Sequence, residues 1–102
     1  MLALVLLLAA AQPGPAASGE ALRRRVAAQP AVVRDYFSRR ANCNQFGGEE
    51  PYDADRRREI EAALKDLRCD TIEGEAIFLR RHFAARPETL AVIELADEQT
   101  GW

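Results

Sequence analysis

Apolar residues along the chain recur at helical spacing, and no clear run alternates apolar and polar residues between turn signals. The spacing i, i+3, i+4, i+7 places side chains on one face of an α-helix, whereas a half-buried strand alternates with a period of two. The pattern therefore predicts an all-α protein, built as a small bundle of four or five short helices.

A proline separates the first two predicted helices. Leu22 and Val26 lie four residues apart in the first, which covers residues 20–28. It ends before Pro30, because the residue preceding a proline is disfavoured in the helical region. Pro30 can then take the first position of a second helix, which we expect to end near Asn42. The inner face of this second helix is Val33, Tyr36, Phe37 and Arg40.

A third helix is predicted to begin at an aspartate and to end near Cys69. Either Asp53 or Asp55 can cap it, because a carboxylate at this position accepts a hydrogen bond from a backbone N–H of the first turn. Its apolar stripe is Ile60, Ala63, Leu64 and Leu67.

Capping signals also mark the last two helices. Asp70 and Glu73 have the spacing of a capping box, and Pro87 can start a fifth helix. Gly101 is expected in a left-handed conformation, with Trp102 folded back on the last turn. The inner face of the fourth helix is Ile72, Ala76, Leu79 and Phe83, widened by Ile77 and Phe78; that of the fifth is Leu90, Ile93 and either Ala96 or Asp97.

The first 18 residues carry no charged side chain, and residues 2–11 are all apolar. This run is shorter than the about 20 residues that span a bilayer. An apolar run followed by proline, glycine and small residues is typical of a secretory signal peptide, although a buried N-terminal helix is the alternative. Ala16 and Ser18 predict cleavage before Gly19. We therefore expect a signal peptide at 1–18 and one periplasmic or secreted helical domain at 19–102, without a transmembrane segment.

The chain contains two cysteines, Cys43 and Cys69. An even number in a small exported chain favours a disulfide, whereas two buried thiols would suit a reducing compartment. Both are expected at helix C-terminal ends, which a tight hairpin would separate by about 20 Å. A disulfide needs Cα atoms within about 7 Å. We therefore expect residues 44–52 to run back along the bundle before the third helix begins.

Charge is unevenly distributed, although the net charge is only -2. Residues 20–40 contain six arginines and two carboxylates, a surplus of +4. The triplets at 23–25 and 56–58 do not predict nucleic-acid binding, because consecutive helical residues point about 100° apart and form no stripe. Arg39 and Arg40 belong to a basic region that can meet an anionic envelope surface or the acidic half of another copy, or is simply a solvated helix face.

The segment from Cys43 to Asp53, CNQFGGEEPYD, concentrates acidic and amide groups. A twelve-residue calcium-loop frame starting at Asn42 fails, because neutral amides and Phe46 occupy positions that need anionic oxygens. Two cysteines and the single His82 are also too few for a structural zinc site. No serine-nucleophile or phosphate-loop motif is present. We therefore expect no metal, no cofactor and no enzymatic activity.

Recognition is the remaining class of function. A loop held by a disulfide loses less entropy when it binds a partner. We expect a non-enzymatic protein that binds an envelope protein or cell-wall component, as an accessory or inhibitor-like subunit. The alternative is a small metal-binding or hydrolase-like protein that uses Glu49, Glu50 and Asp53. The candidate binding residues are Phe46, Tyr52, Glu49, Glu50, Asp53, Arg39 and Arg40, although we expect the two aromatics to fold inward over the bundle.

The CNQFGGEEPYD segment, followed by an Arg/Glu-rich helix and LRCD, resembles small exported proteins of Gram-negative bacteria. The resemblance covers residues 36–83. In those proteins an aromatic residue, often Trp, stands at the Phe46 position, and His precedes it where this chain has Gln45, so any role of that His does not carry over. The resemblance implies export and a disulfide, but no activity. It rests on Cys43, Asn44, Gly48, Glu49, Pro51, Tyr52, Asp53 and Cys69.

Overall fold

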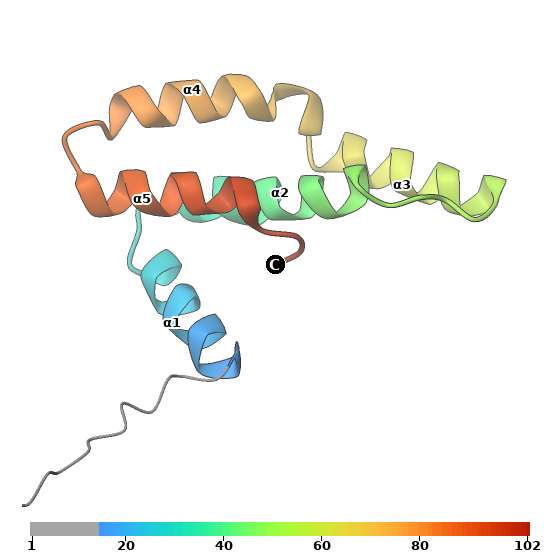
Figure 1. The fold of residues 1–102 in the computed structure, drawn as a ribbon. Helices are drawn as coiled ribbons and strands as arrows, with labels where there is room; N and C mark the ends of the chain where they lie inside the picture. The colour runs from blue at the N-terminus through green and yellow to red at the C-terminus, as the bar shows by residue number, and fades with distance from the viewer. Residues whose placement is uncertain (1–14) are drawn as a thin grey trace, which may run out of the picture.

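The computed structural model describes residues 15–102, so most of the predicted signal peptide lies outside the described residues. Over this range the chain is all-α, which confirms the predicted fold class (Figure 1). None of the described helices is both long and apolar enough to cross a membrane. The helices are α1 (Pro15–Ala27), α2 (Ala31–Gly47), α3 (Ala54–Asp66), α4 (Ile72–His82) and α5 (Pro87–Leu95), with 3₁₀ turns η1 (Cys69–Thr71) and η2 (Ala96–Glu98).

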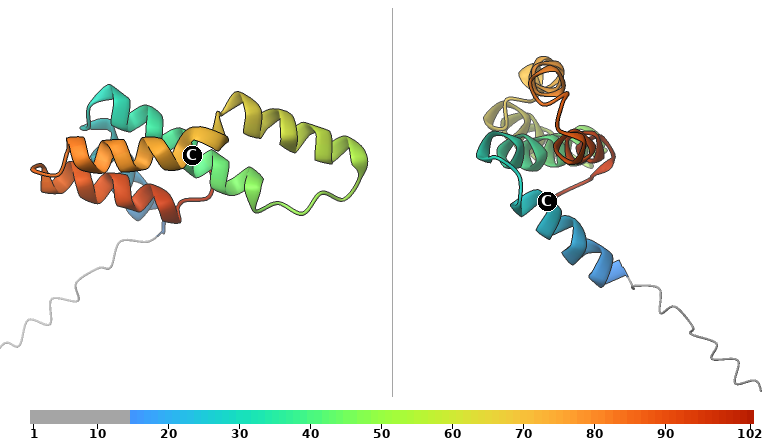
Figure 2. Two further views of the ribbon diagram at one scale, coloured as in Figure 1. Left: turned by 90° about the horizontal axis from the view of Figure 1, so that it is seen from above. Right: turned by 90° about the vertical axis from the view of Figure 1, so that its left-hand side faces the viewer.

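The core lies where α2, α4 and α5 run alongside one another, with α1 crossing below (Figure 2). The predicted inner faces of α2, α4 and α5 are largely confirmed, because most of their members are buried. Half-buried Leu22 and Leu95 pack against this cluster. The buried core residues are Val26, Val33, Tyr36, Phe37, Ile72, Ala76, Leu79, Phe83, Val92, Ile93 and Ala96.

Polar contacts attach α1 to α5. The Thr89 hydroxyl donates a 2.7 Å hydrogen bond to Gln29 Oε1, and both side chains are buried. At the surface, Arg25 Nε donates to Glu88 Oε1 at 2.8 Å. A buried polar group without a hydrogen-bond partner destabilises the folded state. The Gln29–Thr89 hydrogen bond avoids this cost and helps to position the turn between α1 and α2.

Of the predicted helix starts, those of α3 and α5 are confirmed, Pro30 is the N-cap of α2 rather than its first residue, and the capping box before α4 is wrong. Asp53, rather than Asp55, caps α3, because its carboxylate accepts a 2.7 Å hydrogen bond from Arg56 N–H. Pro87 occupies the first turn of α5 as expected. The capping box at Asp70 does not form: residues 69–71 make a 3₁₀ turn, and Thr71 donates its hydroxyl to the Arg68 carbonyl oxygen at 3.0 Å.

The second helix is longer than predicted, and this changes the path to the disulfide. α2 continues to Gly47, so Cys43 lies inside it, and residues 48–53 extend outward rather than back along the bundle (Figure 2). Six extended residues reach about 20 Å. The 13 residues of α3 rise by about the same distance. Because α3 returns antiparallel to α2, its end arrives beside Cys43.

Residues 48–68 form a projecting arm, which consists of the outward segment and α3 (Figure 1). Ile60 is the only residue of α3 that is buried, while Ala63, Leu64 and Leu67 are half-buried. The core cluster contains no residue of the arm. Apolar burial therefore holds the arm weakly, and its attachment depends on contacts at its base.

The last residues of the chain cross to α2 instead of packing on α5, the helix that precedes them. Gly101 has the expected positive φ, 89°. Its N–H donates to the Ala41 carbonyl oxygen at 3.0 Å. The ring of Trp102 meets the Phe37 ring edge-on at 4.7 Å, so the expectation that Trp102 packs on the last turn of its own helix is wrong. A side chain at Gly101 would be strained by this positive φ, and it would also require the end of the Gln45 side chain to move.

Asn44 holds this terminal segment. Its Nδ2 lies 3.0–3.1 Å from the carbonyl oxygens of Ala96, Asp97 and Gln99, so two N–H groups serve three acceptors that follow α5. Of these three acceptors, the Ala96 carbonyl oxygen also accepts the backbone N–H of Gln99 at 3.3 Å. Asn44 therefore joins the end of α2 to the end of α5.

We expect Asn44→Asp to lower the free energy of unfolding by about 2 kcal/mol, and Asn44→Ala by about 1 kcal/mol. Aspartate keeps the size of the side chain but replaces the donor with a carboxylate that faces three carbonyl oxygens. Urea unfolding followed by circular dichroism measures both values. An Asn44→Asp protein as stable as the wild type would contradict this role.

Candidate functional site

The tip of the arm, residues 49–53, carries the most exposed large apolar side chain of the described residues. Tyr52 is 82% exposed, so the expectation that it folds inward is wrong. The reason is the outward path of residues 48–53, which takes Tyr52 away from the core. Phe46 behaves differently: it is half-buried in the last turn of α2.

The acidic residues of the tip are divided among different partners. Glu49 accepts hydrogen bonds from Arg56 Nη2 at 2.6 and 2.9 Å, and these bonds raise the pKa of Arg56. Asp53 caps α3. Glu50 is exposed and makes no ion pair with any described residue. Within the described residues, no group of three or more His, Cys, Asp or Glu side chains is placed to hold a metal ion.

A disulfide joins the arm to α2 at its base, as predicted. Cys43 and Cys69 have Cα atoms 5.7 Å apart and close a segment with a sequence separation of 26. Both thiols are therefore consumed, and neither is available as a nucleophile or a metal ligand. The link holds the end of α3 beside α2 although the rest of the arm contributes little to the core.

Arg39 reinforces this base from inside the molecule. Its Nε donates to the Leu67 carbonyl oxygen at 2.9 Å, and its Nη1 and Nη2 donate to the two Glu75 carboxylate oxygens at 2.6 and 2.9 Å. Nη2 also reaches the Arg68 carbonyl oxygen at 3.3 Å. Arg39 thus joins the carbonyls at the end of α3 to the first turn of α4.

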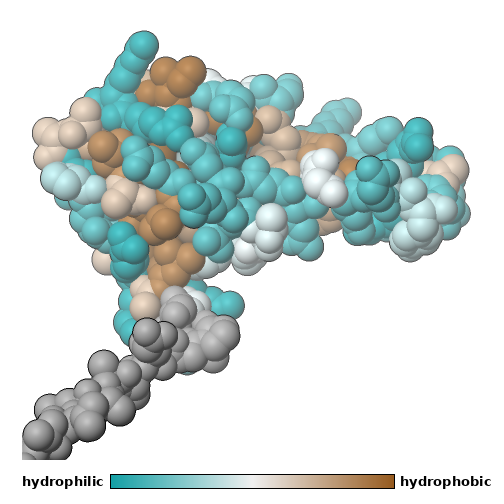
Figure 3. All heavy atoms as spheres, viewed as in Figure 1, coloured by the Kyte–Doolittle hydropathy of each residue, from teal (hydrophilic) through white to brown (hydrophobic). Residues whose placement is uncertain are grey.

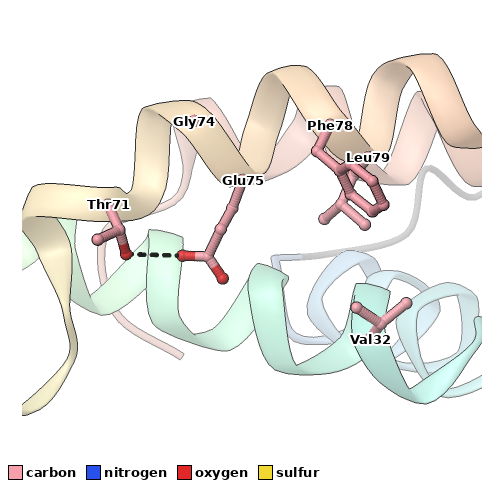
Figure 4. Close-up of a pocket in the computed structure, with 6 residues that line it drawn as sticks. All are labelled: Val32, Thr71, Gly74, Glu75, Phe78 and Leu79. Carbon is pink, nitrogen blue, oxygen red and sulfur yellow. Dashed lines mark hydrogen bonds between the residues drawn. The ribbon is translucent and has the colours of Figure 1, made fainter.

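The charges in this cluster support one another. The guanidinium of Arg39 lowers the pKa of Glu75, and the Glu75 carboxylate raises the pKa of Arg39 against the opposing effect of burial. The Thr71 hydroxyl, which lies 3.0 Å from the Arg68 carbonyl oxygen, is also 3.1 Å from Glu75 Oε2 and shares its one proton between these two acceptors (Figure 4). A bidentate pair between an arginine and a carboxylate is stronger than a neutral hydrogen bond.

Neither Arg39 nor Arg40 forms part of a solvated basic face. Arg39 is 7% exposed. The Arg40 side chain is mostly buried between Glu73, at 2.7 Å, and Asp97, at 3.4 Å. Both guanidinium groups serve the fold, so the structure does not bring these two sequence-predicted binding residues to the tip of the arm.

A second surface, between α2 and α4, was not among the predicted sites. A hollow of about 470 Å³ is lined there by residues from both helices, and Phe78 and Val32 are 63% and 52% exposed. Figure 3 shows hydrophobic residues reaching the surface above α4. Ile77 and Phe78 were expected to widen the inner face of α4, but both are exposed, so that expectation is wrong. The lining residues, drawn in Figure 4, are Val32, Thr71, Gly74, Glu75, Phe78 and Leu79.

Comparison with known proteins found no relative of this chain. No protein-family model, no curated protein and no solved structure matches the chain.

Proposed function

We propose that this small disulfide-containing helical protein is exported to the periplasm and binds another envelope component through the tip of its arm, without catalysis. The observation that carries the proposal is the 82% exposure of Tyr52 on an arm whose base is held by the Cys43–Cys69 disulfide. Export accounts for an oxidising environment in which such a disulfide persists.

The arm suits recognition because it is both exposed and held at its base. Tyrosine is enriched among the residues that contribute most to protein interfaces, since it offers a large rigid surface and a polar hydroxyl. Holding the base of the arm reduces the conformational entropy that binding would otherwise remove. Exposed Glu50 beside Tyr52 favours a partner that presents a cation next to an apolar pocket.

In-cell crosslinking from the tip of the arm, followed by affinity capture from the intact envelope, tests the proposal. We expect Tyr52→Ala to reduce partner capture about tenfold or more, as loss of an interface hot spot does. Phe78→Ala is the matched control, because it removes another exposed aromatic from a surface away from the arm. Capture that is unaffected by Tyr52→Ala would contradict the proposal.

Mass spectrometry under non-reducing conditions tests export independently. We expect a mature protein that begins at Gly19 and lacks two hydrogens relative to the dithiol. An unprocessed chain, or a mature chain without this loss, would remove the argument for a periplasmic location.

The alternative of a metal-binding or hydrolase-like site at Glu49, Glu50 and Asp53 has less support. Glu49 is engaged by Arg56 and Asp53 by the start of α3, so only Glu50 is free of a partner among the described residues. The double variant Glu49→Gln with Asp53→Asn distinguishes the two. If it abolished the protein's effect on the cell, measured as the phenotype of a strain that lacks the protein, while partner capture stayed unchanged, this alternative would replace the binding proposal.

A further inference from the structure

The outer face of α4 carries an ordered set of exposed residues. The inner face of this helix is formed by Ile72, Ala76 and Leu79. A stripe of exposed side chains lies on the opposite side and begins in the 3₁₀ turn before the helix. Its successive members are four, three, one and three residues apart. The outer stripe consists of Asp70, Gly74, Ile77, Phe78 and Arg81.

The centre of the outer stripe is apolar, and the ring of Phe78 stacks on that of His82 with centroids 5.8 Å apart. Ile77 is 51% exposed and Phe78 is 63% exposed, although both lie in the middle of a regular helix. Val32 of α2 extends this apolar surface across the hollow (Figure 4). Adjacent large apolar side chains at the surface of a small protein mark an interaction site more often than isolated ones do.

Gly74 is not required by the fold of the single chain. No atom outside its own helix lies within 4 Å of the position that a Cβ would take there. Glycine is less favourable inside a helix than any residue except proline. A glycine in the outer stripe does, however, let another chain approach the helix backbone closely.

The two ends of the outer stripe carry opposite charges. Asp70 precedes α4 and Arg81 lies in its last turn, and neither makes an ion pair within residues 19–102. Other acidic residues lie at the start of α4 and other basic residues at its end. An antiparallel copy of the same helix would therefore place acidic groups opposite basic groups at both ends.

We propose that the outer stripe is the interface of a homodimer, in which α4 of one copy pairs antiparallel with α4 of a second copy. With the two-fold axis beside Ala76, Asp70 faces Arg81 of the other copy, and Ile77 and Phe78 face its Gly74. Each relation occurs twice, as in any isologous interface. One symmetry operation thus explains the exposed apolar pair, the glycine and the unpaired charges.

The dimer is expected to be weak. The stripe spans about 17 Å of helix, so its interface is smaller than the about 1,600 Å² of a standard stable complex. Dissociation constants in the range of about 10–100 μM suit an interface of that size. The small net charge of the chain, -2, offers little general repulsion between copies.

Sedimentation equilibrium of the oxidised protein, as recovered from cells, tests the proposal between about 5 μM and 1 mM. We expect the weight-average mass to approach that of a dimer. Arg81→Asp alone and Asp70→Arg alone should each weaken dimerisation about tenfold or more, because like charges then face one another twice. Arg57→Asp on α3 makes the same charge change away from the stripe and should leave the equilibrium unchanged.

Mixing the two single variants provides the decisive measurement. A complex of one Arg81→Asp chain with one Asp70→Arg chain again joins opposite charges at both ends, so the mixture should dimerise where each variant alone does not. Failure of the mixture to form the heterodimer would overturn the proposed pairing.

Gly74→Gln separates a structural from an interface role. Glutamine favours a helix more than glycine does, so the melting temperature of the monomer should rise. The same substitution fills the space opposite Ile77 and Phe78 and should weaken the dimer about tenfold. A wild-type protein that stays monomeric at about 1 mM, or crosslinks from residue 78 that reach only a different protein, would overturn the proposal.

The dimer and the proposed function are tested separately. Phe78→Ala should abolish dimerisation, and Tyr52→Ala should leave it unchanged. For capture of the envelope partner by the arm, Tyr52→Ala should reduce the amount captured and Phe78→Ala should leave it unchanged.

Discussion

Removing the Cys43–Cys69 disulfide is expected to lower the free energy of unfolding by about 3.5 kcal/mol. In the chain-entropy model, this is the stabilisation that comes from closing a loop of the observed sequence separation, 26 residues. A domain of this size is commonly stable by only about 5–10 kcal/mol. The double variant Cys43→Ala with Cys69→Ala, compared with the oxidised protein in urea unfolding, measures the loss.

The loss of protection should be greatest in the arm. Hydrogen exchange of the double variant should show faster exchange of α3 amides than of α2, α4 and α5 amides, because Ile60 is the only buried residue of α3. The oxidised protein treated with a thiol reagent but no reductant is the control. Equal loss of protection throughout the molecule would show that the disulfide supports the core rather than the arm.

Arg39→Met is expected to lower the free energy of unfolding by about 3 kcal/mol. The substitution keeps an unbranched side chain, but it leaves the Leu67 carbonyl and the Glu75 carboxylate without their donor. Breaking a buried charged pair costs about 3–5 kcal/mol, and the lower end applies because Glu75 is partly open to water.

Two further variants separate charge from geometry at this position. Arg39→Lys keeps the charge but loses the planar fork, so it should recover only part of the stability. Arg57→Met changes an exposed arginine of the arm and should alter stability by less than about 0.5 kcal/mol. An Arg39→Met protein within about 1 kcal/mol of the wild type would contradict the proposed role of Arg39.

The same pair predicts a dependence on pH. The folded state holds the pKa of Glu75 below its ordinary value of 4.5, so the carboxylate stabilises the fold above that pH. This contribution is lost as the pH falls through the lowered pKa. In Glu75→Gln the difference in stability between neutral and acidic pH should be smaller than in the wild type, as measured by urea unfolding at several pH values.

The periodic apolar pattern predicted the helices and most of the core. Val33, Tyr36 and Phe37 are buried as expected, and so are the four inner residues of α4. Local capping chemistry was less reliable. Asp53 caps α3, but Asp70 does not cap α4, because α4 is approached through a 3₁₀ turn, and the Arg68 carbonyl oxygen before this turn accepts from Arg39 and Thr71.

The end of α2 shows why the candidate site was only partly predictable. Polar residues and glycines after Asn42 resemble a loop, yet the helix continues to Gly47. There Asn44 binds the carbonyls after α5 and Cys43 joins Cys69. Such contacts between distant segments override a weak local preference. Because the helix continues, the following segment leaves the core and carries Tyr52 outward.

Sequence alone determined the helical class, most of the inner faces and the pairing of the only two cysteines, because spacing along the chain and cysteine number are local properties. Tertiary structure decided the path of the arm, the exposure of Tyr52, the internal role of Arg39 and the outward position of Phe78. Each depends on how close residues distant in sequence come to one another, and the helical period of a single segment carries no information about that distance.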